Sequence, residues 1–471
     1  MSLATLCDLP SVEIAPSDGP TAIIGGGLLG LTLAYRLSQV GMPVELFDAA
    51  DGVGGVMRAT LFNDFQVDGF YHTILSSDHN LLELIDEVGL GDQTFFSKTL
   101  NGFYADGQIF PINTALDLLR FKPLTIWERL RLGVGSQVCR LHSDWRKLDD
   151  VPVRDYLVKY CGRGAFDKFW MHLLRCKYED AFDQLPATAI WARIRRMSGS
   201  KSSKAKSSDK KLGWDLLGYL KGGYQALIDR LVERITESGG VVHTGTPVQG
   251  IAVDGRRVHG IVTANGLIEF PRVISTVAYQ MIARMLPDEC ASLRARLQSQ
   301  QYMGSICMLL MLKRRLSPYH CLYLLDQAIP FTGIIETTHY IDPSELGGHH
   351  LVYLSKYFKP DSPLGRMPED EVKREFMQHF SRMFPDVRPS DIVHTMFARE
   401  RFVDPIRRVG EARAIPSVTG SGIDGLFLAN NCQIYPRLPS GESVVEFANE
   451  VFREIQEVGV RTSSRNQGAV E

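Results

Sequence analysis

The chain has 471 residues, a formal net charge of −2 and 44% hydrophobic residues. This length predicts two or three domains of an ordinary globular protein, and the balanced charge excludes the basic field typical of nucleic-acid binding. The eight cysteines are scattered, without a CxxC pair or a zinc-type histidine spacing, so we expect free thiols in a reducing compartment and no metal site.

The N-terminal segment does not resemble a signal peptide, because it has neither a basic start nor a long apolar core. The chain also lacks an apolar run of the length that spans a membrane. We therefore expect a cytoplasmic protein, with residues 1–19 and 461–471 as flexible tails.

The first predicted elements are a buried strand at residues 21–24 and an amphipathic helix that ends at Gly41. Gly25, Gly27 and Gly30 lie in the turn between them, in GGGLLG. In such a turn the first glycine allows a tight bend, the second admits a pyrophosphate and the third lets the helix pack on the strand. The turn therefore predicts a dinucleotide at the helix N-terminus.

A carboxylate and a second glycine pair follow at the spacing that a nucleotide-binding unit needs. VELFD predicts a second strand that ends at Asp48, where a carboxylate can accept hydrogen bonds from ribose hydroxyls. Gly54 and Gly55 come next, in DGVGGVMR, and suit a loop that passes under the same pyrophosphate. An NAD enzyme has no usual need for this second pair, so the stretch favours FAD.

These residues resemble a known family, the FAD-dependent oxidoreductases that include monoamine oxidase, protoporphyrinogen oxidase and phytoene desaturase. The resemblance lies in GGGLLGLTLAYRLSQVG, in Asp48, where the family more often has glutamate, and in the Gly54–Gly55 pair. It implies FAD as the cofactor. The residues expected to bind it are Gly25, Gly27, Leu29, Gly30, Asp48, Gly54, Gly55, Gly69, Val248, Asn430, Asn431, Gly441, Ser443 and Val444.

Three later segments support the resemblance. GGYQALIDRLVERITESGGVVHTG predicts a helix and a third parallel strand, after which Val248 fits the residue whose backbone pairs with adenine in the family. DG and NG turns within residues 254–266 predict a small β-meander that returns to the sheet through VISTV. GLFLAN resembles the family's late strand, with Asn430 and Asn431 in place of its acidic end, and a helix near residues 440–443 would direct its N-terminus at the flavin pyrimidine.

The expected fold class is α/β: an FAD-binding, Rossmann-like domain of the glutathione-reductase type with a β-meander crossover, and a discontinuous α+β substrate domain. The FAD-binding domain is assigned to residues 20–75, 213–279 and 401–460, and the substrate domain to residues 76–212 and 280–400. We expect residues 76–212 to be mostly helical and residues 280–400 to include buried strands such as SICMLLML. The Ser/Lys-rich segment 197–211 is typical of a mobile loop.

Three side chains are candidates for catalysis. QVDGFYHTI (66–74) corresponds to a segment that skirts the flavin ring in the family, so His72 lies either near the ring or in a hydrogen bond within its loop. Arg175 and Lys177, in LLRCKY, match a segment that tends to face the substrate cavity. A fourth residue, Glu336 in GIIETTHY, is either a base with a raised pKa or a paired structural acid, and we favour the second interpretation.

The resemblance implies hydride transfer from an apolar or amphipathic small-molecule substrate to N5 of the flavin. Two alternatives are a redox-neutral enzyme resembling UDP-galactopyranose mutase and a non-catalytic binding protein of the GDP-dissociation-inhibitor type. The glycine turn, Asp48 and the second glycine pair argue against the binding protein.

Residues 111–141 combine leucines, Ile126 and Trp127 with arginines and Lys122 at helical spacing. Such a helix can lie transiently in a lipid headgroup layer. The alternative, which we favour from sequence, is that its apolar face packs against the FAD-binding domain.

Overall fold

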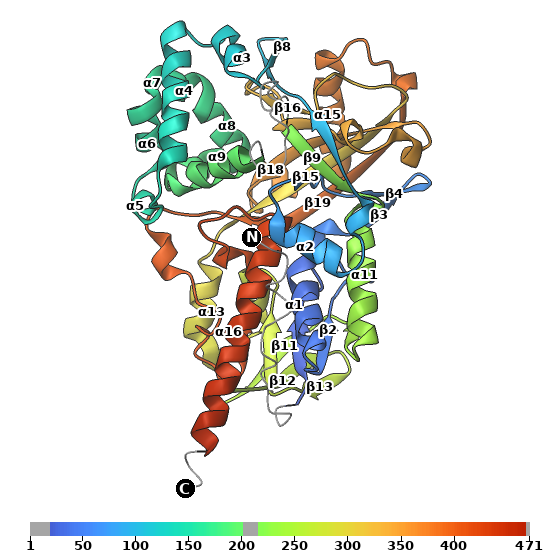
Figure 1. Ribbon diagram of the computed structural model, residues 1–471, viewed down its shortest axis with the longest axis vertical. Helices are drawn as coiled ribbons and strands as arrows, with labels where there is room; N and C mark the ends of the chain where they lie inside the picture. Colours follow the sequence, from blue (N-terminus) through green and yellow to red (C-terminus); the bar gives the residue numbers. More distant parts are fainter. Residues whose placement is uncertain (1–18, 201–214, 468–471) are drawn as a thin grey trace.

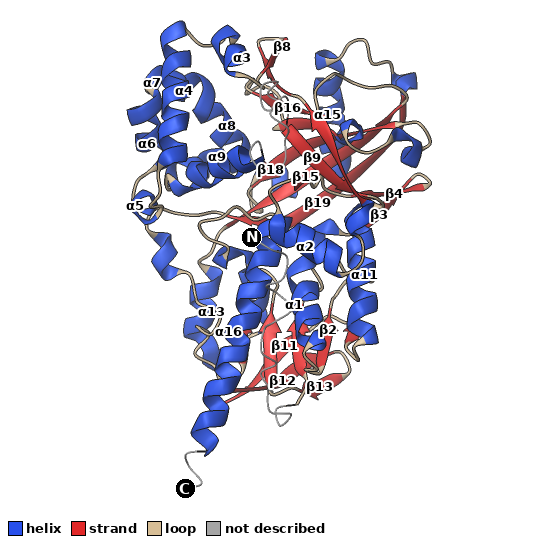
Figure 2. Ribbon diagram, in the orientation of Figure 1, coloured by secondary structure: helices blue, strands red, loops and turns tan. Residues whose placement is uncertain are grey.

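The computed structural model describes residues 19–200 and 215–467. The lower half of the molecule in Figure 1 is built on a parallel sheet, and the upper half on a larger, mostly antiparallel sheet with helices on either side (Figures 1 and 2). Within the described ranges, no helix is both long enough and apolar enough to cross a membrane.

The lower sheet has five strands in the order β10-β2-β1-β14-β20, and every neighbouring pair is parallel. The strands are β1 (Thr21–Ile24), β2 (Val44–Phe47), β10 (Val241–His243), β14 (Arg272–Ser275) and β20 (Leu426–Leu428). All four residues of β1 are buried, as expected for the central strand of a sheet covered on both faces. The predicted strand order along the chain is confirmed.

Helices cover one face of this sheet and a β-meander covers the other. Ile23 and Ile274 pack against α1 (Leu28–Gln39), α11 (Gly223–Glu237) and α16 (Gly441–Gln467). Ala22 and Ile24, which alternate with Ile23, pack in the cluster that holds the meander. The elements on this second face are β11 (Gly250–Asp254), β12 (Arg257–Thr263), β13 (Gly266–Glu269), α12 (Tyr279–Met285) and α13 (Ala291–Gln298).

The upper sheet has seven strands in the order β19-β15-β18-β17-β16-β7-β8, of which only the β16–β7 pair is parallel. The strands are β7 (Asn101–Ala105), β8 (Gln108–Pro111), β15 (Tyr302–Leu312), β16 (Cys321–Leu324), β17 (Gly333–Glu336), β18 (His350–Phe358) and β19 (Ile392–Pro405). All 11 residues of β15 are buried, so SICMLLML is the predicted core strand. One face of the sheet packs on α15 (Glu369–Met383) through Phe376 and Phe380.

A block of helices lies beside the other face of the upper sheet (Figure 1). It comprises α3 (Ala115–Arg120), α4 (Ile126–Leu141), α5 (Arg146–Asp149), α6 (Val153–Cys161), α7 (Arg163–Ala165), α8 (Met171–Tyr178) and α9 (Thr188–Ser200). The short elements that join the halves are β3 (Ala59–Phe62), β4 (Phe65–Asp68), β5 (Ile74–Leu75), α2 (His79–Glu87), β6 (Thr94–Thr99) and β9 (Asp215–Leu220), and α14 (Pro363–Arg366) precedes α15.

Three sequence-based expectations need correction. Residues 76–212 are less helical than expected, because β6 and β7 lie there and pair with strands far along the chain, and β8 adds a local hairpin to β7. Residues 197–200 continue α9, while 201–211 fall outside the described ranges. Residues 461–467 extend α16, whereas 1–18 and 468–471 are not described. The domain boundaries stay a prediction.

Candidate active site

The turn between β1 and α1 is shaped by its glycines. Gly25 has φ of +105°, a conformation that other residues rarely adopt. A Cβ on Gly30 would overlap the carbonyl oxygen of Gly25, so only glycine lets α1 approach β1 this closely. A Cβ on Gly27, in contrast, would have no atom within 4 Å. The space in front of the α1 N-terminus is therefore open, and a phosphate can reach the backbone N–H groups there.

Asp48 and the second glycine pair close around this turn. One carboxylate oxygen of Asp48 accepts the N–H of Gly26 at 2.7 Å, and the other accepts that of Ala50 at 2.8 Å. The N–H of Gly54 donates to the carbonyl oxygen of Gly26 at 2.7 Å. Gly54 and Gly55 both have positive φ, +118° and +57°. Each Asp48 oxygen keeps a lone pair for a ribose hydroxyl, so these residues, which we call the glycine cradle (residues 25–30, 48 and 54–55), fit the pyrophosphate and ribose of FAD.

The other predicted cofactor residues follow the carboxyl ends of the same parallel strands or begin α16. Val248 is buried beyond the end of β10, and Leu29 lies buried in the first turn of α1. Because parallel strands present their carboxyl ends at one edge, residues after β1, β2, β10 and β20 meet there, which is the usual ligand edge of such sheets. Gly69 is not required by packing, since the nearest atom to a Cβ there would be Ala398 Cβ at 3.8 Å.

The N-terminus of α16 is held by its own serines. The Ser443 hydroxyl accepts the N–H of Ser440 at 2.9 Å and donates to the Leu438 carbonyl at 2.6 Å, so its role here is capping. Val444 packs against the core below the helix. A Cβ on Gly441 would lie 2.9 Å from the hydroxyl of Tyr224, so the backbone at this helix start comes close to that phenol.

The two asparagines after β20 differ. Asn430 uses its side chain within the protein: Oδ1 accepts from Tyr302 Oη and Cys432 N, both at 2.9 Å, and Nδ2 donates to the Val277 carbonyl at 2.7 Å. These bonds hold the Asn430 side chain within the protein, so the predicted cofactor contact of Asn430 would come from its backbone. Asn431 donates to the Val403 carbonyl at 2.9 Å, but its buried Oδ1 has no partner among the described residues.

His72 lies beside the cofactor end of α16. Its ring packs edge-on against Tyr224 at a centroid distance of 5.4 Å, and Tyr224 in turn reaches Gly441. Burial lowers the pKa of His72 to about 4, so the imidazole is neutral at physiological pH. Its buried Nδ1 makes no hydrogen bond of good geometry within the described part of the chain. A hydrogen bond with the backbone of Phe70 acts against burial on this pKa, so the structure places His72 beside Tyr224 and also in contact with its own loop, and both interpretations of His72 stay predictions.

Asp68, which sequence reasoning did not select, ends β4 immediately before Gly69. Burial raises its pKa from 3.8 to about 7, and a hydrogen bond from the Tyr224 backbone offsets this only in part. Its Oδ1 is buried without a partner among the described residues. Tyr353 Oη donates to the Asp68 carbonyl at 2.7 Å and fixes the backbone. The sequence did hold a signal for Asp68, because this acid ends a strand directly before Gly69, a predicted cofactor residue.

The two cationic candidates on α8 point to different sides of the helix. Lys177 Nζ lies 2.5 Å from Asp404 Oδ2, and both side chains are nearly buried. Arg175 is exposed and its guanidinium lies 5.6 Å from the Phe182 ring centroid. The expectation that both face one substrate cavity is therefore wrong for Arg175, because residues two apart on a helix diverge.

Glu336 is a structural acid, as favoured from sequence. Its carboxylate accepts the N–H groups of Leu316 at 3.2 Å and Ser317 at 3.3 Å, and lies 3.5 Å from His339 and 3.4 Å from His350. These partners account for a carboxylate that is only 1% exposed.

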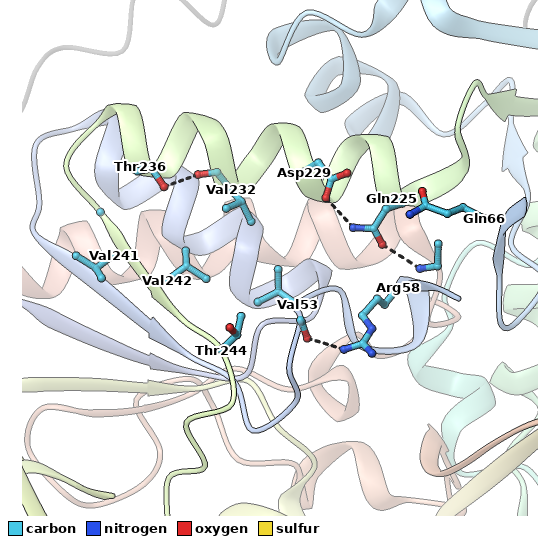
Figure 3. Close-up of a pocket in the computed structure, with 13 residues that line it drawn as sticks. Val53, Arg58, Gln66, Gln225, Asp229, Val232, Thr236, Val241, Val242 and Thr244 are labelled. Atoms are coloured by element: carbon cyan, nitrogen blue, oxygen red, sulfur yellow. Dashed lines mark hydrogen bonds between the residues drawn. The ribbon is translucent and has the colours of Figure 1, made fainter. Parts of the chain in front are cut away.

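A surface hollow of about 710 Å³ lies beside the glycine cradle but is separate from it (Figure 3). Residues of α11 and β10 line it, together with Val53 and Arg58 from the loop around Gly54. Arg58 there pairs with Asp51 at 2.7 Å instead of turning to the cradle. None of the predicted cofactor residues lines the hollow.

Comparison with known proteins agrees with this geometry. Residues 30–435 match the family described as flavin containing amine oxidoreductase. Mitochondrial protoporphyrinogen oxidase of Nicotiana tabacum is 26% identical over 257 residues, 48% of this chain and 51% of that protein. The zeta-carotene-forming phytoene desaturase of Myxococcus xanthus is 25% identical over 332 residues, 62% of this chain and 60% of that protein. The chain thus spans only about half to three fifths of these relatives.

Among solved structures, reduced UDP-galactopyranose mutase superposes with a TM-score of 0.72 at 16% identity, covering 93% of this chain and 96% of the other. At this identity the likeness shows the fold alone. The family match covers most of the chain, and the glycine cradle fits its cofactor. The chain therefore belongs to the flavin-containing amine oxidoreductase family and is, by that membership, an FAD-dependent oxidoreductase.

Proposed function

We propose that the protein removes a hydride from an apolar or amphipathic small molecule and transfers it to N5 of FAD. The observation that carries this proposal is the aromatic and largely uncharged surrounding of His72. Tyr224 packs on its ring, Tyr71 precedes it, and Tyr340 Oη donates to its carbonyl oxygen at 3.4 Å. Such a site excludes water and binds an apolar carbon skeleton, and hydride transfer needs no protein nucleophile.

Bound FAD supplies the hydride acceptor, and the chain supplies position and proton handling. The glycine cradle would hold the pyrophosphate, and the N-terminus of α16 would favour negative charge on the pyrimidine through its dipole. Asp68, with a pKa of about 7, can take or release a proton at neutral pH. Neutral His72 can accept a hydrogen bond or a proton from the substrate through Nδ1.

The names of the relatives support the substrate class. Porphyrinogens and phytoene are large apolar or amphipathic molecules, and the curated relatives are named for acting on them. The likeness to UDP-galactopyranose mutase favours the redox-neutral alternative only at the level of fold.

Anaerobic titration separates these functions. Protoporphyrinogen IX, phytoene and UDP-galactopyranose are added in turn to the oxidised holoprotein, and flavin absorbance is followed. A hydride donor bleaches the flavin without another reductant. Turnover of UDP-galactopyranose that needs prior reduction, and leaves the flavin reduced, would replace our proposal with the mutase function.

We further propose that the protein is cytoplasmic and meets its substrate at the surface of an anionic membrane. The side chains of Trp127, Val134 and Leu141 on α4 are 73%, 61% and 73% exposed, while Leu132 and Cys139 on the opposite face are buried. The alternative that this apolar face packs on the FAD-binding domain is not supported. Exposed basic side chains flank it, at Arg120, Lys122, Arg131 and Arg140, and suit an anionic headgroup layer.

Vesicle flotation tests the membrane contact. With vesicles of phosphatidylcholine and phosphatidylserine at low salt, the wild type should float, and Trp127→Ser with Leu141→Ser should stay in the soluble fraction. Leu61→Ser is the matched control, because Leu61 is 70% exposed on the distant β3–β4 hairpin. Equal flotation of both variants, or none by the wild type, contradicts the proposal.

A further inference from the structure

Side chains from six separate segments meet between the helical block and the upper sheet, next to His72. They come from the loop after β4, from α8, α9, β16 and β18, and from the end of β19. We call this group the tyrosine chamber; its members are Tyr71, Lys177, Tyr178, Arg193, Tyr323, Tyr357 and Asp404.

Most side chains of the chamber are surrounded by protein but not fully buried. Tyr71, Arg193, Tyr323 and Tyr357 all keep partial solvent accessibility. Burial nevertheless raises the pKa of Tyr71. The pKa of Tyr323 is raised by the neighbouring Cys321 thiol and by burial. The pKa of Tyr357 is raised by the neighbouring Tyr71 and by burial. These side chains are therefore surrounded by protein without being fully sealed from solvent. Since Tyr71 precedes His72, the chamber lies next to the residue that we expect beside the flavin ring.

The charges in the chamber do not balance. Lys177 is paired with Asp404 at 2.5 Å, and its ammonium also lies 5.1 Å from the ring centroid of Tyr357. The phenols are neutral at physiological pH because their pKa values are raised. Arg193, within the described residues, makes neither an ion pair nor a hydrogen bond. Within the part of the chain that the structure describes, no anionic group therefore pairs with its guanidinium.

We propose that Arg193 binds an anionic group of the substrate, a carboxylate or a phosphate, inside the tyrosine chamber. A deeply placed guanidinium without a partner is unfavourable unless a ligand anion completes it, and a guanidinium matches carboxylate and phosphate in a two-point contact. The neighbouring phenols add hydrogen bonds and apolar surface, so the rest of an amphipathic molecule extends toward His72. This proposal rests on the proposed function, since it names the substrate class for the same site.

Ligand binding to the oxidised holoprotein tests the proposal without turnover. Benzoate and inorganic phosphate serve as anionic probes and benzyl alcohol as the neutral counterpart of benzoate, with flavin absorbance as the signal. Benzoate, phosphate or both should perturb the spectrum saturably and benzyl alcohol much more weakly. Arg193→Met should weaken anion binding about tenfold to a hundredfold with unchanged FAD content, and Arg193→Lys should retain part of it.

Arg195→Met is the matched control, because Arg195 is exposed on the same helix and lies over the Trp191 ring at 5.0 Å. Thermal unfolding gives a second signal. Without ligand, Arg193→Met should unfold at a higher temperature than the wild type, since an unpaired internal charge is removed. With benzoate, the wild type should gain more than the variant.

Three results would overturn the proposal: absence of any response to benzoate and phosphate, equal response to benzoate and benzyl alcohol, or unchanged anion binding in Arg193→Met. A difference between benzoate and phosphate identifies the anion. Failure of the anaerobic bleaching, with anion binding intact, would remove the hydride-transfer function and leave Arg193 as an anion site.

Discussion

The glycine cradle and the tyrosine chamber bind their ligands with different parts of the chain. The cradle uses backbone N–H groups and open space, and all its residues lie between Gly25 and Gly55. The chamber uses side chains from six segments between Tyr71 and Asp404. Binding by backbone N–H groups requires glycines, which leave space for the ligand. Binding in the chamber requires particular side chains that the fold brings together. The cofactor can therefore be recognised locally, and the substrate cannot.

The sharpest test of this comparison is a pair of glycine variants in the cradle. Gly27→Leu should abolish FAD binding with little effect on the fold, because its side chain would fill open space that the pyrophosphate needs. Gly30→Ala should instead destabilise the protein by about 1–3 kcal/mol, since its Cβ overlaps the Gly25 carbonyl oxygen. Flavin absorbance per protein and the thermal unfolding midpoint measure the two effects. Equal effects of both variants would contradict the distinction between ligand space and packing space.

On the chamber side, Lys177→Met should lower the free energy of unfolding by about 3–5 kcal/mol, because it leaves Asp404 buried without its partner. Arg175→Met is the control on the same helix, and its effect should stay within about 0.5 kcal/mol, since Arg175 is exposed. Chemical denaturation of both variants decides. A loss for Arg175→Met as large as that for Lys177→Met would mean that α8 is oriented differently.

Asp68 lies where the two regions meet, and its raised pKa predicts a pH dependence of stability. Below its unfolded pKa of 3.8 the carboxyl is protonated in both states; between there and about 7 only the unfolded state releases the proton, so stability falls as pH rises. Asp68→Asn removes this loss, and should stabilise the protein at about pH 8 by at most about 4 kcal/mol and by less at about pH 5. Thermal unfolding at both pH values measures this. A variant that is less stable than the wild type at about pH 8 would show that Asp68 is charged and paired.

The smallest effect is expected for His72→Ala, which touches the reaction but not the cradle. The rate of flavin bleaching by a hydride donor should fall about tenfold to a hundredfold, with unchanged FAD content. His259→Ala on the meander is the control, because His259 is exposed and far from Tyr224. An unchanged rate would assign His72 to the support of its loop.

The sequence predicted the order of the parallel strands, the meander and the glycine turn. These features are encoded by neighbours: a glycine's missing side chain, a two-residue hairpin turn or an apolar run such as residues 302–312 acts over a few residues. It did not predict β6 and β7, whose pairing partners β9 and β16 lie more than a hundred residues away, nor β8, which only extends β7 at the sheet edge. Nor did it show that Arg175 points outward or that Asn430 is used up in protein hydrogen bonds.

By itself, the sequence determined that this chain binds FAD at the edge of a parallel sheet, because the contacts are made by backbone whose shape glycines set locally. Only the tertiary structure decided that Oδ1 of Asp68 is buried without a partner among the described residues, that α4 shows an apolar face to solvent and that Arg193 lies among tyrosines without a described anionic partner. The burial of a side chain and the charge around it depend on residues that are far apart in the chain. A local sequence pattern therefore cannot predict them.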